Sequence, residues 1–309
     1  MDREITVPHI EQPTRLDKFL VQELGSGWSR TFIQQAIKNN AIKVNEKKVT
    51  VHHFLKEGDV IMVGVITPEV RTELEPQAKV PWKLIKETND FLIIEKPTGV
   101  IVHPAPGINE PTLIEGLLSK YPELKDVGDD PMRPGIVHRL DRDVSGLMVV
   151  ARNQNMFDYL KRLFKEREIT KKYFALVVGH LNQPDGVINF PLARSRNKHG
   201  KMAARAKSDS DTREAVTKFE LIKLYQPASL LKIEIETGRT HQIRAHLAAL
   251  GYPIVGDNLY RPKKLNFKAT PERLFLHATE LSFVDQNGEN QTFTSPLPQE
   301  LNDFLNKLS

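Results

Sequence analysis

The stretch Pro134-Gly-Ile-Val-His-Arg-Leu-Asp-Arg-Asp-Val-Ser-Gly-Leu-Met-Val-Val-Ala151 holds the densest group of titratable side chains in this sequence. Its pattern predicts an apolar strand, a charged loop from His138 to Asp143, and a second apolar strand at Leu147–Ala151. Loops held by a rigid scaffold often carry reactive groups. Composition alone nevertheless favours the simpler interpretation, which is a solvated hairpin with paired charges at its tip.

Strands and helices alternate on both sides of this stretch, without an internal repeat. The other expected strands are Leu84–Ile85, Phe91–Glu95, Val100–His103, Tyr173–Val178, Leu230–Glu236 and Leu276–Phe283. The expected helices are Thr112–Lys120, Asn153–Glu166, Thr240–Leu250 and Pro298–Leu308. Several strands are joined by short turns, which favours a mixed or antiparallel sheet over a doubly wound one.

A smaller unit precedes this region. Helical spacing from Arg15 to Leu24 puts four apolar side chains on one face, and a second helix is expected at Arg30–Lys38 with Ser29 as its cap. Short strands are expected at Ala41–Asn45 and Val60–Val65. A charged stretch with prolines, residues 71–81, is typical of a linker. We therefore expect an N-terminal domain at 1–70, the linker, and a larger domain at 82–309.

The composition bounds the class of protein. A chain of 309 residues predicts two domains, and 39% hydrophobic with 27% charged residues is typical of a soluble globular protein. The absence of cysteine excludes disulfides, thiolate catalysis and thiolate-bound zinc. No apolar run approaches the roughly 18–20 residues of a membrane helix, and the N-terminus lacks an apolar signal core. We expect a cytoplasmic protein.

The net charge of +5 points only weakly to a polyanionic partner. Cations gather in two stretches: residues 29–48 carry five against one acid, and residues 194–218 carry eight against three. Such runs are usually solvated faces. The two nucleotide-binding signatures, GxGxxG and GxxxxGK[ST], are absent, so no nucleotide cofactor is expected.

Three further motifs accompany the charged loop. Glu236-Thr-Gly-Arg-Thr-His-Gln-Ile-Arg-Ala-His-Leu places Arg239 and Arg244 near a helix N-terminus, which suits phosphate or carboxylate. His241 and His246 are five apart with no acid between them, so no metal site is expected. Lys171-Lys-Tyr-Phe-Ala-Leu-Val-Val-Gly predicts a strand, and Glu95-Lys-Pro-Thr-Gly-Val-Ile-Val-His-Pro a tight turn. None of these motifs identifies a function alone.

In this order and spacing, the four motifs closely resemble those of the RluA-type pseudouridine synthases. The resemblance extends to Gly251–Asp257 and Phe275–Ala278 and covers residues from about 84 to 300. The N-terminal unit resembles the small α/β RNA-binding domain that ribosomal protein S-four shares with other proteins. This combination looks like the RluD-like branch of the family, which modifies uridines in large-subunit ribosomal RNA.

The resemblance implies a fold, a reaction and a catalytic set. The fold is α+β, a mixed and largely antiparallel central sheet with flanking helices and a cleft across it. The reaction turns uridine into pseudouridine in RNA, most simply 23S ribosomal RNA, without cofactor or metal. By this resemblance Asp141 is the nucleophile, Tyr173 stacks on the uracil and can help to remove the C5 proton, and Arg244 pairs with Asp141. Arg139 enters the RNA where the target base is flipped out.

The distribution of charge favours further RNA contacts outside this set. Arg30, Lys38, Lys43 and Lys47 are expected to contact phosphates, and Arg239 to bind RNA beside the cleft. The basic stretch 194–218 is expected to be a loop that contacts the RNA backbone. Nothing in the sequence demands more than a monomer.

Two departures from the family pattern and two rival functions remain. Val144 stands where the family has a hydroxyl residue, and Asn40 and Glu46 stand where it has glycine, so a turn of altered shape is expected. One rival is an RNA-binding or ribosome-assembly factor without catalysis. The other is a hydrolase that uses Asp141 and Asp143 as a carboxylate pair, although residues two apart on a loop rarely face one another.

Overall fold

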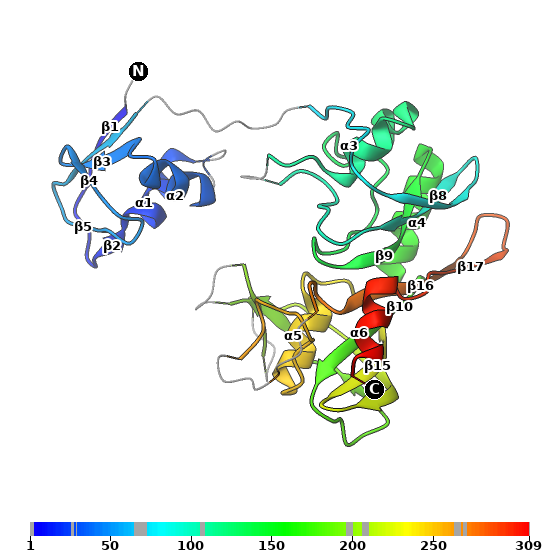
Figure 1. Cartoon of the computed structure of the whole chain (residues 1–309). Helices are drawn as coiled ribbons and strands as arrows, with labels where there is room; N and C mark the ends of the chain where they lie inside the picture. Colours follow the sequence, from blue (N-terminus) through cyan, green and yellow to red (C-terminus); the bar gives the residue numbers. More distant parts are fainter. Residues whose placement is uncertain are drawn as a thin grey trace. The chain divides into compact units, whose positions relative to one another are not determined.

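The structure is a computed structural model that describes residues 3–25, 28, 30–64, 73–105, 109–195, 200–205, 210–262, 267 and 271–308. The chain divides into two compact units (Figure 1). The N-terminal unit comprises Met1–Leu74 with Pro104–Glu110, and the sheet unit comprises Glu75–His103 with Pro111–Ser309. The expected cap Ser29 lies outside the described residues. None of the described helices combines the length and the apolar character that crossing a bilayer requires.

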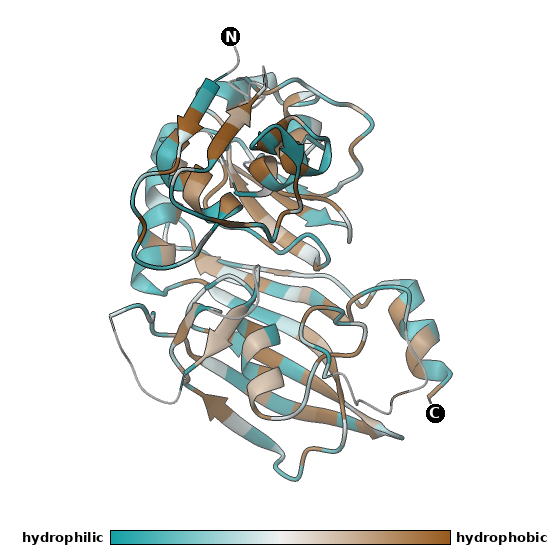
Figure 2. Ribbon diagram, turned by 90° about the vertical axis from the view of Figure 1, so that its left-hand side faces the viewer, coloured by the Kyte–Doolittle hydropathy of each residue, from teal (hydrophilic) through white to brown (hydrophobic). Residues whose placement is uncertain are grey.

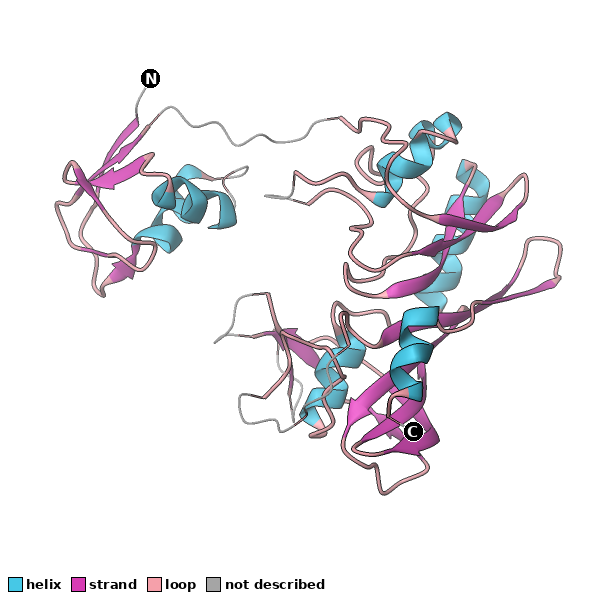
Figure 3. Ribbon diagram, viewed as in Figure 1, coloured by secondary structure: helices cyan, strands magenta, loops and turns pink. Residues whose placement is uncertain are grey.

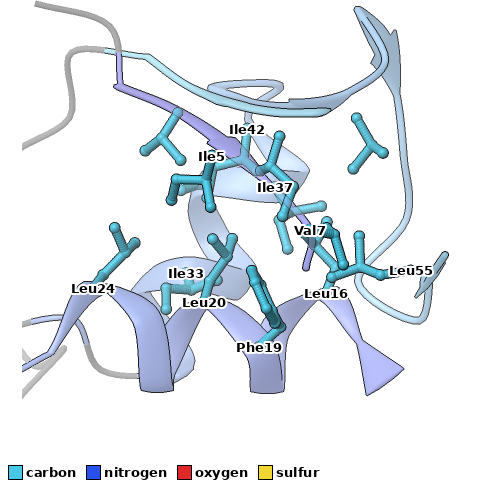
Figure 4. Close-up of a cluster of buried hydrophobic side chains, with 14 residues drawn as sticks. Ile5, Val7, Leu16, Phe19, Leu20, Leu24, Ile33, Ile37, Ile42 and Leu55 are labelled. Carbon is cyan, nitrogen blue, oxygen red and sulfur yellow. The ribbon is translucent and has the colours of Figure 1, made fainter. Parts of the chain in front are cut away.

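The N-terminal unit packs two helices against an antiparallel sheet. Its strands, in spatial order, are β1 (Arg3–Thr6), β6 (Val60–Val63), β3 (Ile42–Val44) and β4 (Lys47–Lys48). Its helices are α1 (Leu16–Leu24) and α2 (Arg30–Lys38), and β2 (Thr14–Arg15) pairs with β5 (Phe54–Leu55). Figure 4 shows apolar side chains of both helices meeting those of the sheet, including Leu16, Phe19, Leu20, Ile33, Ile37, Ile5 and Ile42. The expected helices are confirmed, whereas no sequence pattern predicted β1.

Non-glycine residues form the turn between β3 and β4, where Glu46 stands in place of a glycine of the family. Asn45 and Glu46 both have positive φ, 50° and 62°, as the two central residues of a type I′ hairpin require. The Asn45 side chain donates to Asp59 Oδ1 and accepts from the Val60 N–H, both at 2.8 Å. Asn40 is also left-handed, with φ 60°. Non-glycine residues therefore take the left-handed backbone here, and the expected change of turn shape stays a prediction.

The sheet unit is built on nine strands, and it confirms the expected mixed, largely antiparallel sheet. Their spatial order is β11 (Asp185–Ile188), β14 (Thr217–Tyr225), β15 (Ala228–Ile235), β10 (Thr170–Val178), β16 (Leu276–Val284), β9 (Ser145–Ala151), β8 (Phe91–Lys96) and β7 (Lys83–Glu87), with β17 (Asn290–Thr294) also on β16 (Figure 3). All these pairs are antiparallel except β9 with β16. Hydrophobic and hydrophilic bands alternate along the strands in Figure 2.

Helices flank this sheet as expected. They are α3 (Leu113–Leu118), the 3-10 helix η1 (Pro122–Asp126), α4 (Gln154–Glu166), α5 (Gln242–Ala249) and α6 (Gln299–Asn306). Asn153 caps α4 by accepting from the Met156 N–H at 2.9 Å, and Arg167 ends it in a left-handed conformation. The apolar face of α4 packs on β8 and β9 in one buried cluster. This packing fixes β9, the strand that follows the charged loop.

Three sequence expectations are wrong in the sheet unit. Val100–His103 is not a strand, because the Ile101 and Val102 carbonyls accept from Leu113 and Ile114 at the start of α3. The strand expected before His138 is only a single bridge between Ile136 and Val150. The basic stretch 194–218 is not one loop, since β12 (Leu192–Arg194) pairs with β13 (Met202–Ala204).

The linker expected at 71–81 also differs in its described part. Residues 75–81 belong to the sheet unit, where Gln77 N–H donates to the Glu115 carbonyl of α3 at 2.9 Å. Gly116 of α3 comes close to Val80, which leaves no room for a Cβ without a shift. This segment is therefore packed structure.

Gly146 allows β9 to approach β16. Its φ is +123°, and an added Cβ would lie 2.2 Å from the Ala278 carbonyl oxygen. We expect Gly146→Ala to destabilise the chain by at least about 3 kcal/mol, because backbone cannot yield as a side chain can. Gly288→Ala is the control, since φ is +81° there but nothing lies within 4 Å; it should cost only about 1 kcal/mol. Equal shifts in denaturant midpoint for the two variants would contradict the steric explanation.

Candidate active site

A cleft of about 530 Å³ lies in the sheet unit beside the charged loop. The main segments that line the cleft are the loop around Asp141, the start of β10, the end of α4, and the segment from Ile235 to Arg244. The structure thus brings together five of the predicted site residues, which are Asp141, Tyr173, Arg244, Arg139 and Arg239. The other four, Arg30, Lys38, Lys43 and Lys47, lie in the N-terminal unit.

Asp141 faces a buried arginine that a second carboxylate holds in place. Arg244 Nη1 donates to Asp141 Oδ2 at 3.3 Å, while its Nε and Nη2 donate to both oxygens of Asp257 at 2.7 and 3.0 Å. The side chains of Arg244 and Asp257 are 6% and 0% exposed, against 18% for Asp141. Burial opposes the charge of Arg244, but the bonds and charges of Asp257 and Asp141 raise its pKa. Arg244 therefore keeps its positive charge beside Asp141, which is the more exposed of the two carboxylates.

Tyr173 forms part of the cleft wall on β10. Its side chain is buried, with 6% of the residue exposed. Burial raises the pKa of the Tyr173 phenol, and the nearby charge of Asp141 raises it further. The phenol is therefore protonated at neutral pH, and its ring offers an apolar face to the cleft.

A turn after β8 holds the charged loop from the other side. Lys96 is fully buried and donates to three carbonyls, those of Pro97, Val100 and Arg142, at 2.8 to 3.0 Å. The Gly99 N–H also donates to the Arg142 carbonyl at 2.8 Å. Burial, then the charge of Arg273, lowers the pKa of Lys96 to about 7. The Lys-Pro-x-Gly motif thus fixes the backbone just after Asp141.

The strand that follows the loop begins in a buried polar network. Ser145 Oγ lies 2.8 Å from His277 Nδ1 and accepts from Arg273 Nη2 at 2.6 Å. On its far side, His277 Nε2 is 3.1 Å from Ser295 Oγ. Burial lowers the pKa of His277 to about 4, so the ring is neutral and can bond to both hydroxyls. This network joins β9 to β16 and holds the end of the loop.

The start of α5 is held by the Gln242 side chain. Its Oε1 accepts from the Arg239 N–H at 3.1 Å, and its Nε2 donates to the Val216 carbonyl at 2.9 Å. His241 takes a left-handed conformation, with φ 54°, and puts its Nε2 3.7 Å from Asp141 Oδ2. Burial is the main cause that lowers the pKa of His241, so a neutral ring lies beside the carboxylate. The conformation of this short segment positions the side chains of both His241 and Arg244.

Comparison with known proteins fits this arrangement. The sequence profile described as RNA pseudouridylate synthase matches residues 90–249, and the S4 domain profile matches residues 14–61. The chain belongs to the RNA pseudouridylate synthase family. An uncharacterized RNA pseudouridine synthase of Bacillus subtilis, YlyB, is 35% identical over 99% of this chain and 97% of its own.

Two other relatives extend the comparison. The ribosomal large subunit pseudouridine synthase D of Nitrosomonas europaea is 34% identical over 96% of this chain and 85% of its own. The structure of human RNA pseudouridylate synthase domain containing 1 aligns with a TM-score of 0.58 and 28% identity, over 73% of this chain and 87% of that one. The chain is thus an RNA pseudouridine synthase with an N-terminal S4 domain.

The cleft of the synthase is lined by more cations than its sequence indicated. Among the described residues, two acids line it, Asp141 and Glu236. The cations that line it are Arg133, Arg139, Lys165, Arg167, Lys171, Arg239 and Arg244. Four of these were not predicted, because they come from the loop before the motif, the end of α4 and the start of β10. The one sequence feature that could have indicated them is the group of basic residues at the end of α4.

Several side chains near the motif have other tasks in the synthase. His138 Nε2 accepts from the Val149 N–H at 3.0 Å, and its ring stacks on Phe164 at 4.7 Å. Asp143 lines a different pocket of about 480 Å³, which Asp141 does not line. Val144, which has no hydroxyl, is buried on the cleft wall. Within the described ranges, no group of three potential metal ligands occurs.

In the S4 domain of the synthase, Arg30 already has a partner. The buried Asp17 carboxylate accepts from Arg15 at 3.0 and 2.6 Å, from Arg30 at 2.8 Å and from Gln34 at 2.6 Å. Burial raises the pKa of Asp17, but these donors together lower it to about 2. Arg30 keeps only 27% of its side chain exposed. Lys38, Lys43 and Lys47 are exposed.

Asp257 should be essential to both the stability and the activity of the synthase. Asp257→Asn removes the charge that balances buried Arg244, and breaking such a pair costs roughly 3 kcal/mol. We expect a lower denaturant midpoint together with loss of pseudouridine formation. Asp141→Asn is the matched control, because it leaves the Arg244–Asp257 bonds in place and should change the midpoint little. A stable Asp257→Asn variant would contradict this view of the ion pair.

Proposed function

We propose that this synthase isomerises specific uridines of large-subunit ribosomal RNA to pseudouridine, with Asp141 as the nucleophile. One observation carries the proposal: Asp141 lies in a basic cleft and accepts a hydrogen bond from Arg244, a buried arginine that also binds Asp257. Several relatives are named ribosomal large subunit pseudouridine synthase D, which supports the choice of RNA. Cytoplasmic location, a monomeric state and independence of cofactors stay predictions.

The proposed reaction needs only side chains. The Asp141 carboxylate attacks C1′ of the flipped-out uridine, and the bond from C1′ to N1 breaks. The uracil rotates, and C5 attacks C1′ while the bond from C1′ to Asp141 breaks and returns its electron pair to the carboxylate. The C5 proton then passes to solvent, and N1 regains a proton. Arg244 positions the carboxylate, and Tyr173 stacks on the base as a neutral phenol, since its raised pKa makes it a poor base. Arg139, exposed at the cleft, fills the gap left in the RNA stack.

The decisive variant is Asp141→Asn. It keeps the size of the side chain but removes the charge that attacks C1′. We expect the native chain to release tritium from C5-labelled uridine in 23S ribosomal RNA, and the variant to release none above background. Release is measured together with RNA affinity, which should change little because one side chain among many contacts is altered.

The same assay separates the rival functions. Release by both proteins would remove Asp141 from its role while keeping the reaction. Binding without release by the native chain would favour an RNA-binding factor without catalysis. Free uracil or a shortened strand would favour a hydrolase that uses Asp141 and Asp143.

Three exposed lysines of the S4 domain are proposed to contact phosphates. Replacing Lys38, Lys43 and Lys47 together by Gln should reduce the slope of log affinity against log salt by about 2–3, since each phosphate contact contributes about 0.7–0.9. The control changes Arg3, Lys18 and Lys56, which are also exposed and carry the same total charge. If both triple variants lose the same slope, the lysines act through net charge and not through contact.

A further inference from the structure

Lys171 is a buried cation inside the cleft that lacks an anionic partner. Only 7% of the residue is exposed, and it lines the cleft with Tyr173, two residues along β10 on the same face of the strand. Its ammonium lies 5.3 Å from the ring centre of Phe164. In the part of the chain that the structure describes, this ammonium makes no ion pair and no hydrogen bond to a carboxylate.

The neighbouring lysine shows the contrast. Lys172 points to the opposite side of the strand, where its Nζ donates to Glu280 Oε1 at 2.6 Å. Lys171 has instead an aromatic ring and, behind it, the His138 ring stacked on Phe164. A ring face attracts a cation but does not replace the water that burial removes. Burial accordingly lowers the pKa of Lys171 to about 8.

An unpaired ammonium in a binding cleft is arranged to receive a negative charge from a ligand. We propose that Lys171 is a further catalytic residue, which donates a hydrogen bond to a carbonyl oxygen of the uracil and stabilises the charge that develops on the base. This inference rests on the proposed function. Groups that face a developing charge in a water-poor site lower a barrier strongly, because they are already in position.

The chemistry of the proposed step balances without a co-reactant. When the bond from C1′ to N1 breaks, its electron pair goes to N1 and is shared with the carbonyl oxygens of the uracil. The Lys171 ammonium keeps its proton and offsets this charge. When C5 attacks C1′, the bond from C1′ to Asp141 breaks and the negative charge passes from the base to the Asp141 carboxylate. The C5 proton then goes to solvent, and N1 takes a proton from solvent.

The position of Lys171 favours the base over a phosphate as its ligand. Phosphates stay in contact with water at the edge of an RNA-binding cleft, where the exposed Arg139 lies. Lys171 is buried and shares its strand face with Tyr173, the residue proposed to stack on the uracil. A carbonyl oxygen of the uracil that stacks on Tyr173 is therefore the acceptor that we expect nearest to Lys171.

The test compares Lys171→Met, Lys171→Arg and, as matched control, Lys172→Met. Single-turnover tritium release and RNA affinity are measured with C5-labelled 23S ribosomal RNA, with Asp141→Asn alongside. We expect Lys171→Met to slow release about 100-fold at saturating enzyme, with unchanged affinity and salt slope. Lys171→Arg should restore most of the rate, and Lys172→Met should behave like the native chain. Lys171→Met should unfold no earlier than the native chain, because it removes a buried charge.

The pH profile adds an independent readout. Other titratable groups line the cleft around Lys171: His103, His138 and His241 have lowered pKa values, Tyr173 has a raised one, and Asp141, Glu236 and Lys165 complete the set. Lys96, beside the loop, has a pKa lowered to about 7 and titrates in all variants alike. The ratio of kcat/KM for Lys171→Arg to that for the native chain should therefore rise through about pH 8, as native Lys171 loses its charge.

Each other outcome has a distinct meaning. A loss of affinity and a smaller salt slope in Lys171→Met, with an unchanged rate at saturation, would make Lys171 a phosphate contact and overturn the proposal. An unchanged rate and affinity would overturn it as well, and so would a flat ratio in the pH profile. Failure of the native chain to release tritium would overturn the proposed function itself, whereas native release that Asp141→Asn abolishes leaves only Lys171 in question.

Discussion

The buried pair of Arg244 and Asp257 is the interaction on which the site depends. A guanidinium that is 6% exposed needs a partner that is always charged, and Asp257 supplies two bonds to it. The same carboxylate accepts from the Leu259 and Tyr260 N–H groups, both at 2.9 Å, so it also shapes the chain after it. Tyr260 then lies under Arg244, with its ring centre 5.2 Å away. Asp257 therefore has a structural role. Asp141 accepts one longer hydrogen bond from Arg244, and part of its side chain stays exposed.

The loop that carries Asp141 is held at both ends by groups that cannot move easily. Before Asp141, His138 accepts from the Val149 N–H; after it, Lys96 binds the Arg142 carbonyl and Ser145 joins the network with His277 and Arg273. Between these anchors Asp141 and Arg139 reach the cleft. Fixed backbone at both ends with free side chains between them suits a site that acts on a large and flexible polymer.

Sequence reasoning found the parts that local pattern determines. The helices α1, α2 and α4 have apolar residues at helical spacing, and their bounds agree closely with the expected ones. The edge strand β11 and its neighbour β14 escaped it, because β11 has only four residues and a register shift between Leu221 and Lys223 interrupts the alternation of β14. Lysine is seldom buried, so nothing marked Lys96 or Lys171 as interior. The partnership of Arg244 with Asp257 arises only when α5 and the following turn fold against one another, which no spacing rule describes.

The parallel pairing of β9 with β16 has a consequence for synthesis of the chain. Ser145 and Gly146, next to the reactive loop, pair with His277 and Ala278, which are made more than a hundred residues later. Until that distant strand leaves the ribosome, the loop lacks one of its two anchors and Gly146 has nothing to pack against. A chain whose synthesis stops before β16 therefore holds Asp141 on a loop that lacks this support.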